Sequence, residues 1–263
     1  MSRALSCLST RMQEILSEVP KNLPEGAVLC DVGCDHGMLG CALLEREPGA
    51  RVLFSDVSAD CLEKAKHLAE ILDLNARASF FVSNGFAHLT PPAADFSAPA
   101  DPSASSASFS TPADPSAKVV SFSAPVDVAV IAGMGGREIA SILLAAPNSA
   151  KLYVLQPMKN APELREAIAP AGFEILTDRK ITENHRIHDL LKVRYVGKPC
   201  PLTEKEIKYG KTNLISPNPA FVYWVTRRKG MYQSLLARDV TEETHRRASA
   251  ELAELNTLNL EEV

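Results

Sequence analysis

Two glycines and two aspartates occur together in the short segment DVGCDHG, residues 31–37. The apolar residues AVLC precede it and MLGCALLE follows, which predicts a junction between a buried strand and a helix. Gly33 and Gly37 lack a β-carbon and let the backbone approach a ligand closely. Asp31 and Asp35 add negative charge beside them. The segment therefore predicts a binding site that combines backbone amides with carboxylates.

The charge of this segment indicates the kind of ligand it binds. A dinucleotide site needs a G-x-G-x-x-G pattern with pyrophosphate at the helix N-terminus. Asp35 stands where the second glycine of that pattern belongs, and its carboxylate would repel a pyrophosphate. S-adenosylmethionine fits better because it carries a sulfonium and an ammonium group and no phosphate. We expect Asp31 or Asp35 to face the ammonium group, directly or through water, with Cys34 in the same cofactor site.

Further polar and small residues follow the next two apolar runs. Asp56, in FSDVS, is placed to accept both ribose hydroxyls of the cofactor, and Val57 would lie under the adenine. Asn84 and Gly85 are expected at the adenine edge. The alternative is that Asp31 and Asp56 only cap helices. Carboxylates at two successive strand ends, beside glycines, favour the cofactor site.

The segment AGMGG follows another apolar run and predicts the loop that presents the methyl acceptor. Gly133, Gly135 and Gly136 would leave a floor without side chains, on which a flat base rests. Met134 lies between them, and Ala132 is assigned to the cofactor side. The alternative is a tight strand-to-helix turn, which explains one or two glycines.

Regular elements must hold these segments together. Apolar runs alternate with helical patterns along most of the chain, which predicts an α/β fold with a mostly parallel, seven-stranded, Rossmann-like sheet and an antiparallel last strand. In such sheets ligands bind outside the carboxyl ends of the strands, where the segments above lie. The expected strands are 27–33, 51–58, 78–85, 126–136, 152–157, 173–181 and 188–197, and the expected helices are 4–18, 38–47, 59–73, 136–146 and 161–171.

Two other regions have a different composition. Residues 91–125 are rich in Pro, Ser and Ala and repeat FSAPADPSA as FSTPADPSA, so we expect a disordered surface loop. Residues 219–240 and 241–260 have helical apolar spacing and predict a helical hairpin or short coiled coil. The expected organisation is a catalytic domain at 1–198 and a helical domain at 203–260.

Composition restricts the class of protein. The chain has 263 residues, of which 46% are hydrophobic, and a net charge of −4, which argues against a general nucleic-acid coat. No run approaches the roughly 18 apolar residues of a membrane span, and no secretory signal is expected. The six cysteines form no C-x-x-C pair, so we expect a reduced, cytoplasmic protein with no metal site.

The order of several motifs resembles a known family, the bacterial tRNA (adenine-22-N1)-methyltransferases. The resemblance covers nearly the whole chain apart from 87–125, and His188-Asp189 stands where the family usually has an aromatic before an acidic residue. It implies a class I methyltransferase fold with a C-terminal coiled-coil-like domain, and methyl transfer from S-adenosylmethionine to N1 of adenine 22 in tRNA. The motifs are LSTRM, VGCDHG, SNG, IAGMGG, LQP and, in the tail, EIKYGKTNL.

This chemistry needs little acid–base assistance. Adenine N1 has an in-plane lone pair and attacks the sulfonium methyl directly, so holding donor and acceptor in line can supply up to about 7–11 kcal/mol. We expect Asp35 and His36 near the sulfonium and the acceptor, and the backbone of 133–136 as the platform for the base. For His36, a structural hydrogen bond to that loop is an equal alternative.

Other residues are assigned to the substrate. Ser9 and Arg11 would close over the site or contact a phosphate, and Gln156, followed by Pro157, would hydrogen-bond the base. Binding of tRNA also needs cations, although a solvated helix face explains most of them equally well. The candidates are Lys21, Lys159, Arg227, Arg228, Lys229, Arg246 and Arg247.

Two other functions share part of this pattern. A methyltransferase for small molecules would use the same cofactor site, but leaves the cationic tail unexplained. A non-catalytic tRNA-binding protein would not need the intact set of Asp31, Gly33, Asp35 and Asp56. We expect a monomer or weak dimer.

Overall fold

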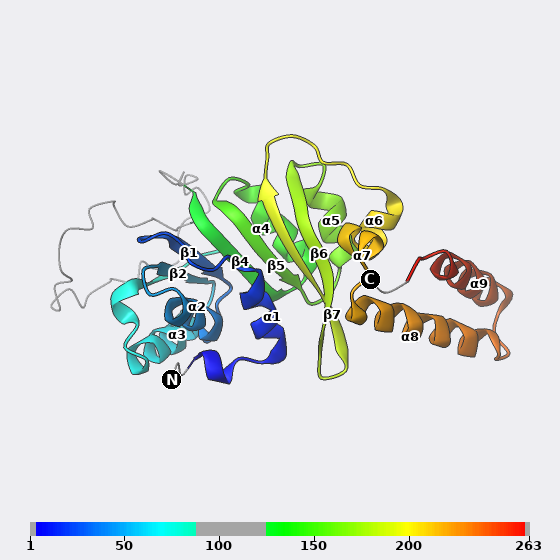
Figure 1. Ribbon diagram of the computed structural model, residues 1–263, viewed down its shortest axis with the longest axis horizontal. Helices are drawn as coiled ribbons and strands as arrows, with labels where there is room; N and C mark the ends of the chain where they lie inside the picture. The colour runs from blue at the N-terminus through cyan, green and yellow to red at the C-terminus, as the bar shows by residue number, and fades with distance from the viewer. Residues whose placement is uncertain (1–3, 88–124, 261–263) are drawn as a thin grey trace.

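A single seven-stranded sheet organises the protein (Figure 1). The structure is a computed structural model and describes residues 4–87 and 125–260. The Pro/Ser/Ala-rich segment predicted at 91–125 therefore lies outside the described residues, apart from its last position. The strands are β1 Val28–Val32, β2 Arg51–Asp56, β3 Ala78–Val82, β4 Val126–Met134, β5 Ala150–Pro157, β6 Phe173–Glu183 and β7 Arg186–Tyr195.

The strands follow the order β3-β2-β1-β4-β5-β7-β6. The first five pair in parallel, whereas β7 is antiparallel to both β5 and β6. The predicted mostly parallel sheet with an antiparallel last strand is confirmed. The strand order reverses between β1 and β4, so the carboxyl ends of these two strands flank the crevice where such sheets bind ligands.

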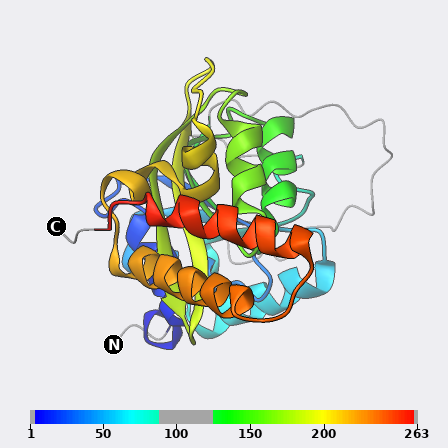
Figure 2. The ribbon, with the colours of Figure 1, turned by 90° about the vertical axis from the view of Figure 1, so that its right-hand side faces the viewer.

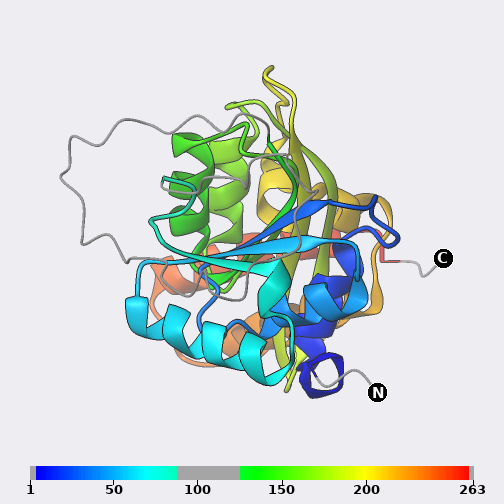
Figure 3. The same cartoon turned by 90° about the vertical axis from the view of Figure 1, so that its left-hand side faces the viewer.

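Helices cover both faces of the sheet (Figure 3). Successive side chains of a strand point to opposite faces, so β4 places Val128 and Val130 in one core and Ala129 and Ile131 in the other. Three helices pack on the first face, α1 Thr10–Glu18, α2 Met38–Arg46 and α3 Ala59–Ile71. Two pack on the second, α4 Gly136–Ala145 and α5 Ala161–Ile168.

The N-terminal segment differs from its prediction. One helix was expected over 4–18, but a 3-10 turn, η1 at Leu5–Cys7, precedes α1 and the backbone is extended at Leu8 and Ser9. The Ser9 hydroxyl accepts a hydrogen bond from Met12 N at 3.3 Å and so caps a new helix start. The break places Ser9 at a cavity that opens at the carboxyl ends of β1 and β4.

The C-terminal part is helical, and α8 and α9 form the expected hairpin (Figure 2). None of the helices in the described ranges is long and apolar enough to cross a membrane. The sequence reasoning missed α6 and α7 because they are short and polar; the signal was a capping box in which Thr203 and Glu206 bond each other's backbone amides. The helices are α6 Glu204–Tyr209, α7 Lys211–Ile215, α8 Pro219–Leu236 and α9 Glu242–Asn256.

A buried charge network joins this part to the sheet. The fully buried Arg165 of α5 donates to both carboxylate oxygens of Asp178, each at 2.7 Å, and to Asp189 Oδ1 at 2.6 Å. Its remaining nitrogen, Nη1, donates to the carbonyl oxygen of Ile207 in α6 at 3.2 Å. Burial alone would raise the pKa of Asp189, but the cations Lys180 and Arg165 lower it to about 2. The network therefore fixes α6 against β6 and β7.

Replacing Arg165 tests this role. Arg165→Met is expected to lower the free energy of unfolding by about 3–5 kcal/mol, because two carboxylates lose their guanidinium partner in the interior. Urea denaturation measures the change. Arg194→Met, which breaks the exposed pair with Glu174, is the control and should cost less than about 1 kcal/mol. Equal losses in the two variants would contradict the assignment.

Candidate functional site

The loop between β1 and α2 is held by the end of β2. Gly33 N and Cys34 N both donate to Ser55 O, at 2.7 and 3.0 Å. Asp35 N donates to Asp56 Oδ2 at 3.0 Å. Asp35 itself has a positive φ of 49°, and its side chain is exposed. The predicted cofactor segment is thus fixed to the neighbouring strand end.

Two glycines of this loop are required by its geometry. Both adopt left-handed backbone, with φ of 71° at Gly33 and 72° at Gly37. A β-carbon on Gly37 would lie 2.6 Å from the Ala65 side chain of α3, and one on Gly33 would lie 2.5 Å from Met134 Cε. Met134 therefore reaches across from the acceptor loop and covers the cofactor loop.

The two strand-end carboxylates also bind backbone amides. Asp31 Oδ2 accepts from Gly40 N of α2 at 2.9 Å, and Asp56 Oδ1 accepts from Ser58 N at 2.9 Å. Both aspartates therefore make the backbone hydrogen bonds that the helix-capping alternative predicts. They also stand at the strand ends where the cofactor is expected. Burial raises the pKa of Asp31 to about 7, and the negative charge of Asp56 adds to the shift. A cation beside Asp31 would relieve this repulsion.

A cavity of about 560 Å³ opens at the carboxyl ends of β1 and β4. Nine of the predicted site residues line it, from the N-terminal segment, the β1–α2 loop and the end of β4. Met12, Ile15, Met38 and Leu39 add an apolar wall that the sequence reasoning did not assign to the site. The nine are Ser9, Arg11, Asp31, Gly33, Cys34, Asp35, His36, Ala132 and Gly133.

The four residues predicted at the adenosine end lie beside this cavity and do not line it. Val57 is 69% exposed and leaves an open apolar surface after β2. Asn84 is exposed, whereas Gly85 is buried and its carbonyl oxygen accepts a hydrogen bond from the Ser55 hydroxyl at 2.9 Å. The ends of β2 and β3 are thereby tied together next to Asp56.

His36 is exposed, and its contacts run along the β1–α2 loop and α3. Its Nε2 atom lies 3.4 Å from Lys64 Nζ and 3.5 Å from Asp35 Oδ1. The described contacts of His36 include no hydrogen bond to residues 133–136. Cys61 Sγ of α3 also donates to Asp35 Oδ1 at 3.5 Å. Sequence reasoning missed Lys64 and Cys61 because both lie inside a helix pattern.

The loop predicted to present the acceptor, residues 132–136, is only partly exposed. Gly133 is exposed with a φ of 81°, and a β-carbon there would meet nothing within 4 Å. Gly135 and Gly136 are buried. A β-carbon on Gly136 would collide with Asn160 O, and Gly136 N donates to Lys159 O at 2.8 Å. Of the three glycines predicted to form the floor, only Gly133 is therefore exposed, whereas Gly135 and Gly136 allow the loop to pack closely against its surroundings.

Arg11 and Gln156 connect α1 to this loop. Gln156 is fully buried, and its Oε1 accepts from Arg11 Nη1 at 2.7 Å and from Gly133 N at 3.3 Å. Its Nε2 donates to Pro157 O at 3.0 Å. Both ends of the amide thus have protein partners, which does not favour the predicted hydrogen bond to the base. Arg11 also pairs with Glu183 of β6 at 3.2 Å, a partner that the sequence reasoning missed.

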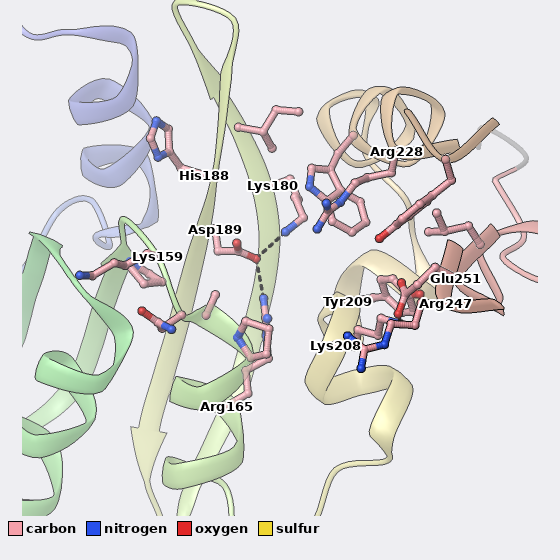
Figure 4. A pocket seen from close by; sticks show the side chains of 18 of the residues that line it. Lys159, Arg165, Lys180, His188, Asp189, Lys208, Tyr209, Arg228, Arg247 and Glu251 are labelled. Atoms are coloured by element: carbon pink, nitrogen blue, oxygen red, sulfur yellow. Dashed lines mark hydrogen bonds and ion pairs between the residues drawn. The ribbon is translucent and has the colours of Figure 1, made fainter. Parts of the chain in front are cut away.

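The predicted cations do not gather in one place. Lys159 and Arg228 line a second cavity, between the β5–α5 loop and the C-terminal helices (Figure 4). Arg227 donates to His185 O at 3.3 Å, on the turn between β6 and β7. Arg246 pairs with Glu243 of its own helix. Pro157 and Arg247 also line the second cavity, whereas Lys21 and Lys229 line neither cavity.

The described residues contain no group of three or more His, Cys, Asp or Glu side chains that could hold a metal ion. All six cysteines are free thiols.

Sequence comparison places these features among known proteins. The profile of the family described as tRNA (adenine(22)-N(1))-methyltransferase matches residues 118–259, more than half of the chain, and a methyltransferase-domain profile matches residues 8–98. A putative tRNA methyltransferase of Mycoplasma pneumoniae is 31% identical over 204 residues, which covers 77% of this chain and 78% of the relative. The tRNA (adenine(22)-N(1))-methyltransferase of Bacillus subtilis is 22% identical and covers 69% of this chain and 64% of its own.

Solved structures share the fold over nearly the whole length. A putative tRNA (m1A22) methyltransferase of Streptococcus pneumoniae, in complex with S-adenosyl-L-methionine, has a TM-score of 0.70 at 22% identity and covers 95% of this chain and 98% of its own. TrmK of M. capricolum, in complex with S-adenosyl-homocysteine, has a TM-score of 0.68 at 16% identity and covers 96% of this chain and 99% of its own. The fold, the profile match and the 31% identical relative agree, and the chain belongs to the tRNA (adenine(22)-N(1))-methyltransferase family.

Proposed function

We propose that this protein transfers the methyl group of S-adenosylmethionine to N1 of adenine 22 in tRNA, giving N1-methyladenosine. Membership of the family carries the proposal. The cavity at the switch point of the sheet supports it, because its wall combines the Asp31 and Asp35 carboxylates with the exposed Gly133. A cationic donor suits the carboxylates, and a flat acceptor suits the open backbone at Gly133.

The cofactor site is assigned from the positions of the carboxylates. Asp31, whose pKa is raised to about 7 by burial, is the natural partner of the α-ammonium group. Asp56 at the end of β2 would bind the ribose hydroxyls through the oxygen lone pairs that its two amide donors leave free. The exposed Val57 would contact the adenine. When bound, the cofactor supplies an electrophilic methyl group.

The protein's own part in the reaction is mainly positioning. Adenine N1 needs no strong base, since the proton leaves later from the exocyclic amine. Gly133 leaves room for the base, and the buried Gln156 holds both Gly133 N and Arg11 in place. Asp35 is an exposed residue of the β1–α2 loop and lines the cavity beside His36, so its side chain would stabilise positive charge there.

We further propose that residues 1–198 form the catalytic domain and residues 203–260 a tRNA-binding domain, in a cytoplasmic monomer or weak dimer. Cations exposed on α8 support the second assignment, as do the aromatic residues of the adjoining cavity. The two alternative functions, small-molecule methylation and tRNA binding without transfer, are separated from this one by a single assay.

That assay uses labelled S-adenosylmethionine and unmodified tRNA, followed by nucleoside analysis. Transfer to N1 of adenine is expected, and a tRNA with guanine at position 22 should accept no label because its N1 carries a proton. Label only on small acceptors, or binding without transfer, would refute the proposal in favour of the corresponding alternative.

The pKa of Asp31 predicts a pH dependence. At pH 6 the carboxyl is mostly protonated in the free protein, because its pKa is raised to about 7. The ammonium group favours the ionised form, so binding releases a proton, and affinity should fall by up to about tenfold per pH unit below 7. Calorimetry with S-adenosylhomocysteine in buffers of different ionisation enthalpy measures both the proton release and the affinity.

Asp60→Asn, on the exposed start of α3, is the control and should keep the wild-type pH profile of affinity. Equal affinity at pH 8 and pH 6 would exclude this role of Asp31.

Gly133 provides a test of the acceptor loop. Gly133→Ala adds a methyl group to the exposed floor and strains the backbone at φ 81°. Since a shift of about 1 Å can cost about 100-fold, kcat/KM for tRNA should fall by 10–100-fold with little change in cofactor affinity. Steady-state kinetics and calorimetry separate the two. Gly230→Ala, where a β-carbon meets nothing within 4 Å, is the matched control. Similar kinetics in both variants would argue against the acceptor floor.

A further inference from the structure

The second cavity lies between the sheet and the C-terminal helices (Figure 4). Its volume is about 1040 Å³, and it is bounded by the β5–α5 loop, β7, α6, α8 and α9. Figure 4 shows Lys159 at one edge and Arg228 and Arg247 on the opposite side. The cavity is therefore formed by segments far apart in the chain, and it exists only when the C-terminal helices are docked.

Most cations in this cavity are neutralised by nearby carboxylates. Lys180 Nζ lies 2.8 Å from Asp189 Oδ1, which also binds the buried Arg165. Lys208 bonds Glu251 at 3.0 Å and Glu254 at 2.6 Å. These cations form structural ion pairs, so they leave little positive charge for an anionic ligand.

Two cations remain in excess. Within residues 4–87 and 125–260, Lys159 and Arg228 form no ion pair with a carboxylate. The Arg228 guanidinium instead lies over the Trp224 ring, 5.3 Å from its centroid. Both residues are exposed, one in the β5–α5 loop and one on α8. An anionic ligand at this cavity would meet positive charge from both sides.

Trp224 gives the cavity an aromatic wall. The ring is half-buried and stacks against Phe221, with centroids 6.0 Å apart and planes 13° apart. Lys180 Nζ lies 4.8 Å from the same ring. Sites that bind unpaired nucleotides combine an aromatic side chain, which contacts the base, with cations, which neutralise the phosphate.

The cavity is connected to the acceptor loop by one short segment. Met158 N donates to Met134 O, and Gly136 N donates to Lys159 O, each at 2.8 Å. The Lys159 side chain runs close to Gly135, since a β-carbon there would lie 3.1 Å from Lys159 Cε. Lys159 thus lies between the acceptor loop and the cavity. An RNA strand that ran from Gly133 toward Trp224 would therefore pass Lys159.

We propose that this cavity is a second nucleotide site, which takes an unpaired nucleotide of the RNA strand that flanks the methylated base. The base contacts the part of the Trp224 side chain that lines the cavity, and the flanking phosphates contact Arg228 inside the cavity and Lys159 at its edge. This rests on the proposed function, since the strand enters from the acceptor loop. An acidic peptide would use the same cations but would bring no flat base to the ring.

Fluorescence tests the site directly, because Trp224 is the only tryptophan in the chain. Binding of unmodified tRNA should change the fluorescence emission of Trp224. Arg228→Gln and Lys159→Gln should each raise Kd by about tenfold, the factor expected for a lost charge-assisted contact. Each should also reduce the slope of log Kd against log salt concentration by about one. Arg238→Gln makes the same charge change just beyond α8 and away from the cavity, and it should behave as the wild type.

Kinetics give an independent readout. KM for tRNA should rise in both cavity variants, and the affinity for S-adenosylhomocysteine should stay at the wild-type value in both. In Arg228→Gln, which lies away from the loop at the end of β4, kcat at saturating tRNA should also stay at the wild-type value. If both variants match Arg238→Gln, the second site is refuted even though tRNA is methylated. An equal fluorescence response to polyglutamate would also refute it. Absence of methylation by the wild type would refute the proposed function instead, and the tRNA titration would still decide the nucleotide site.

Discussion

The hydrogen bonds from the β1–α2 loop to the end of β2 are the constraint on which the site depends. Ser55 O accepts from two successive amides of the loop, and Asp56 accepts from a third. Because β1 and β2 run in parallel with Val32 opposite Ser55, both strand ends reach the same edge of the sheet. Asp31 and Asp56 are thereby held near each other, and burial raises the pKa of Asp31 to about 7. A cationic ligand would reduce the electrostatic repulsion between these two carboxylates, whereas a pyrophosphate would increase the negative charge beside them.

A second constraint acts at the other end of the molecule. Arg165 is buried with Asp178 and Asp189, and it also binds the backbone of α6. A buried ion network gives little net stability, but it is costly to break and therefore specifies one arrangement. Here that arrangement places Trp224 and Arg228 across a cavity from the β5–α5 loop. The same loop is joined by backbone hydrogen bonds to the loop that follows β4, through Met134 O and Gly136 N.

The errors in the sequence reasoning have local physical causes. The helix expected over 4–18 is interrupted because the Ser9 hydroxyl competes for a backbone amide, which an apolar pattern does not reveal. Gly135 and Gly136 looked like part of the acceptor floor, but they are small because the loop packs tightly, and only Gly133 is open. Gln156 was assigned to the base, and that assignment stays a prediction; in the structure its side chain is buried and accepts a hydrogen bond from Arg11.

The sequence by itself determined the sheet, its mainly parallel direction and the glycine-containing loop between β1 and α2, because apolar periodicity and glycine spacing act over a few neighbouring residues. It also determined that carboxylates stand at two strand ends. Only the tertiary structure decided the partners of Arg165, the pairing of Arg11 with Gln156 and Glu183, and the second cavity. These contacts join residues up to 172 positions apart, and their energies depend on burial and mutual distance, which a linear pattern does not contain.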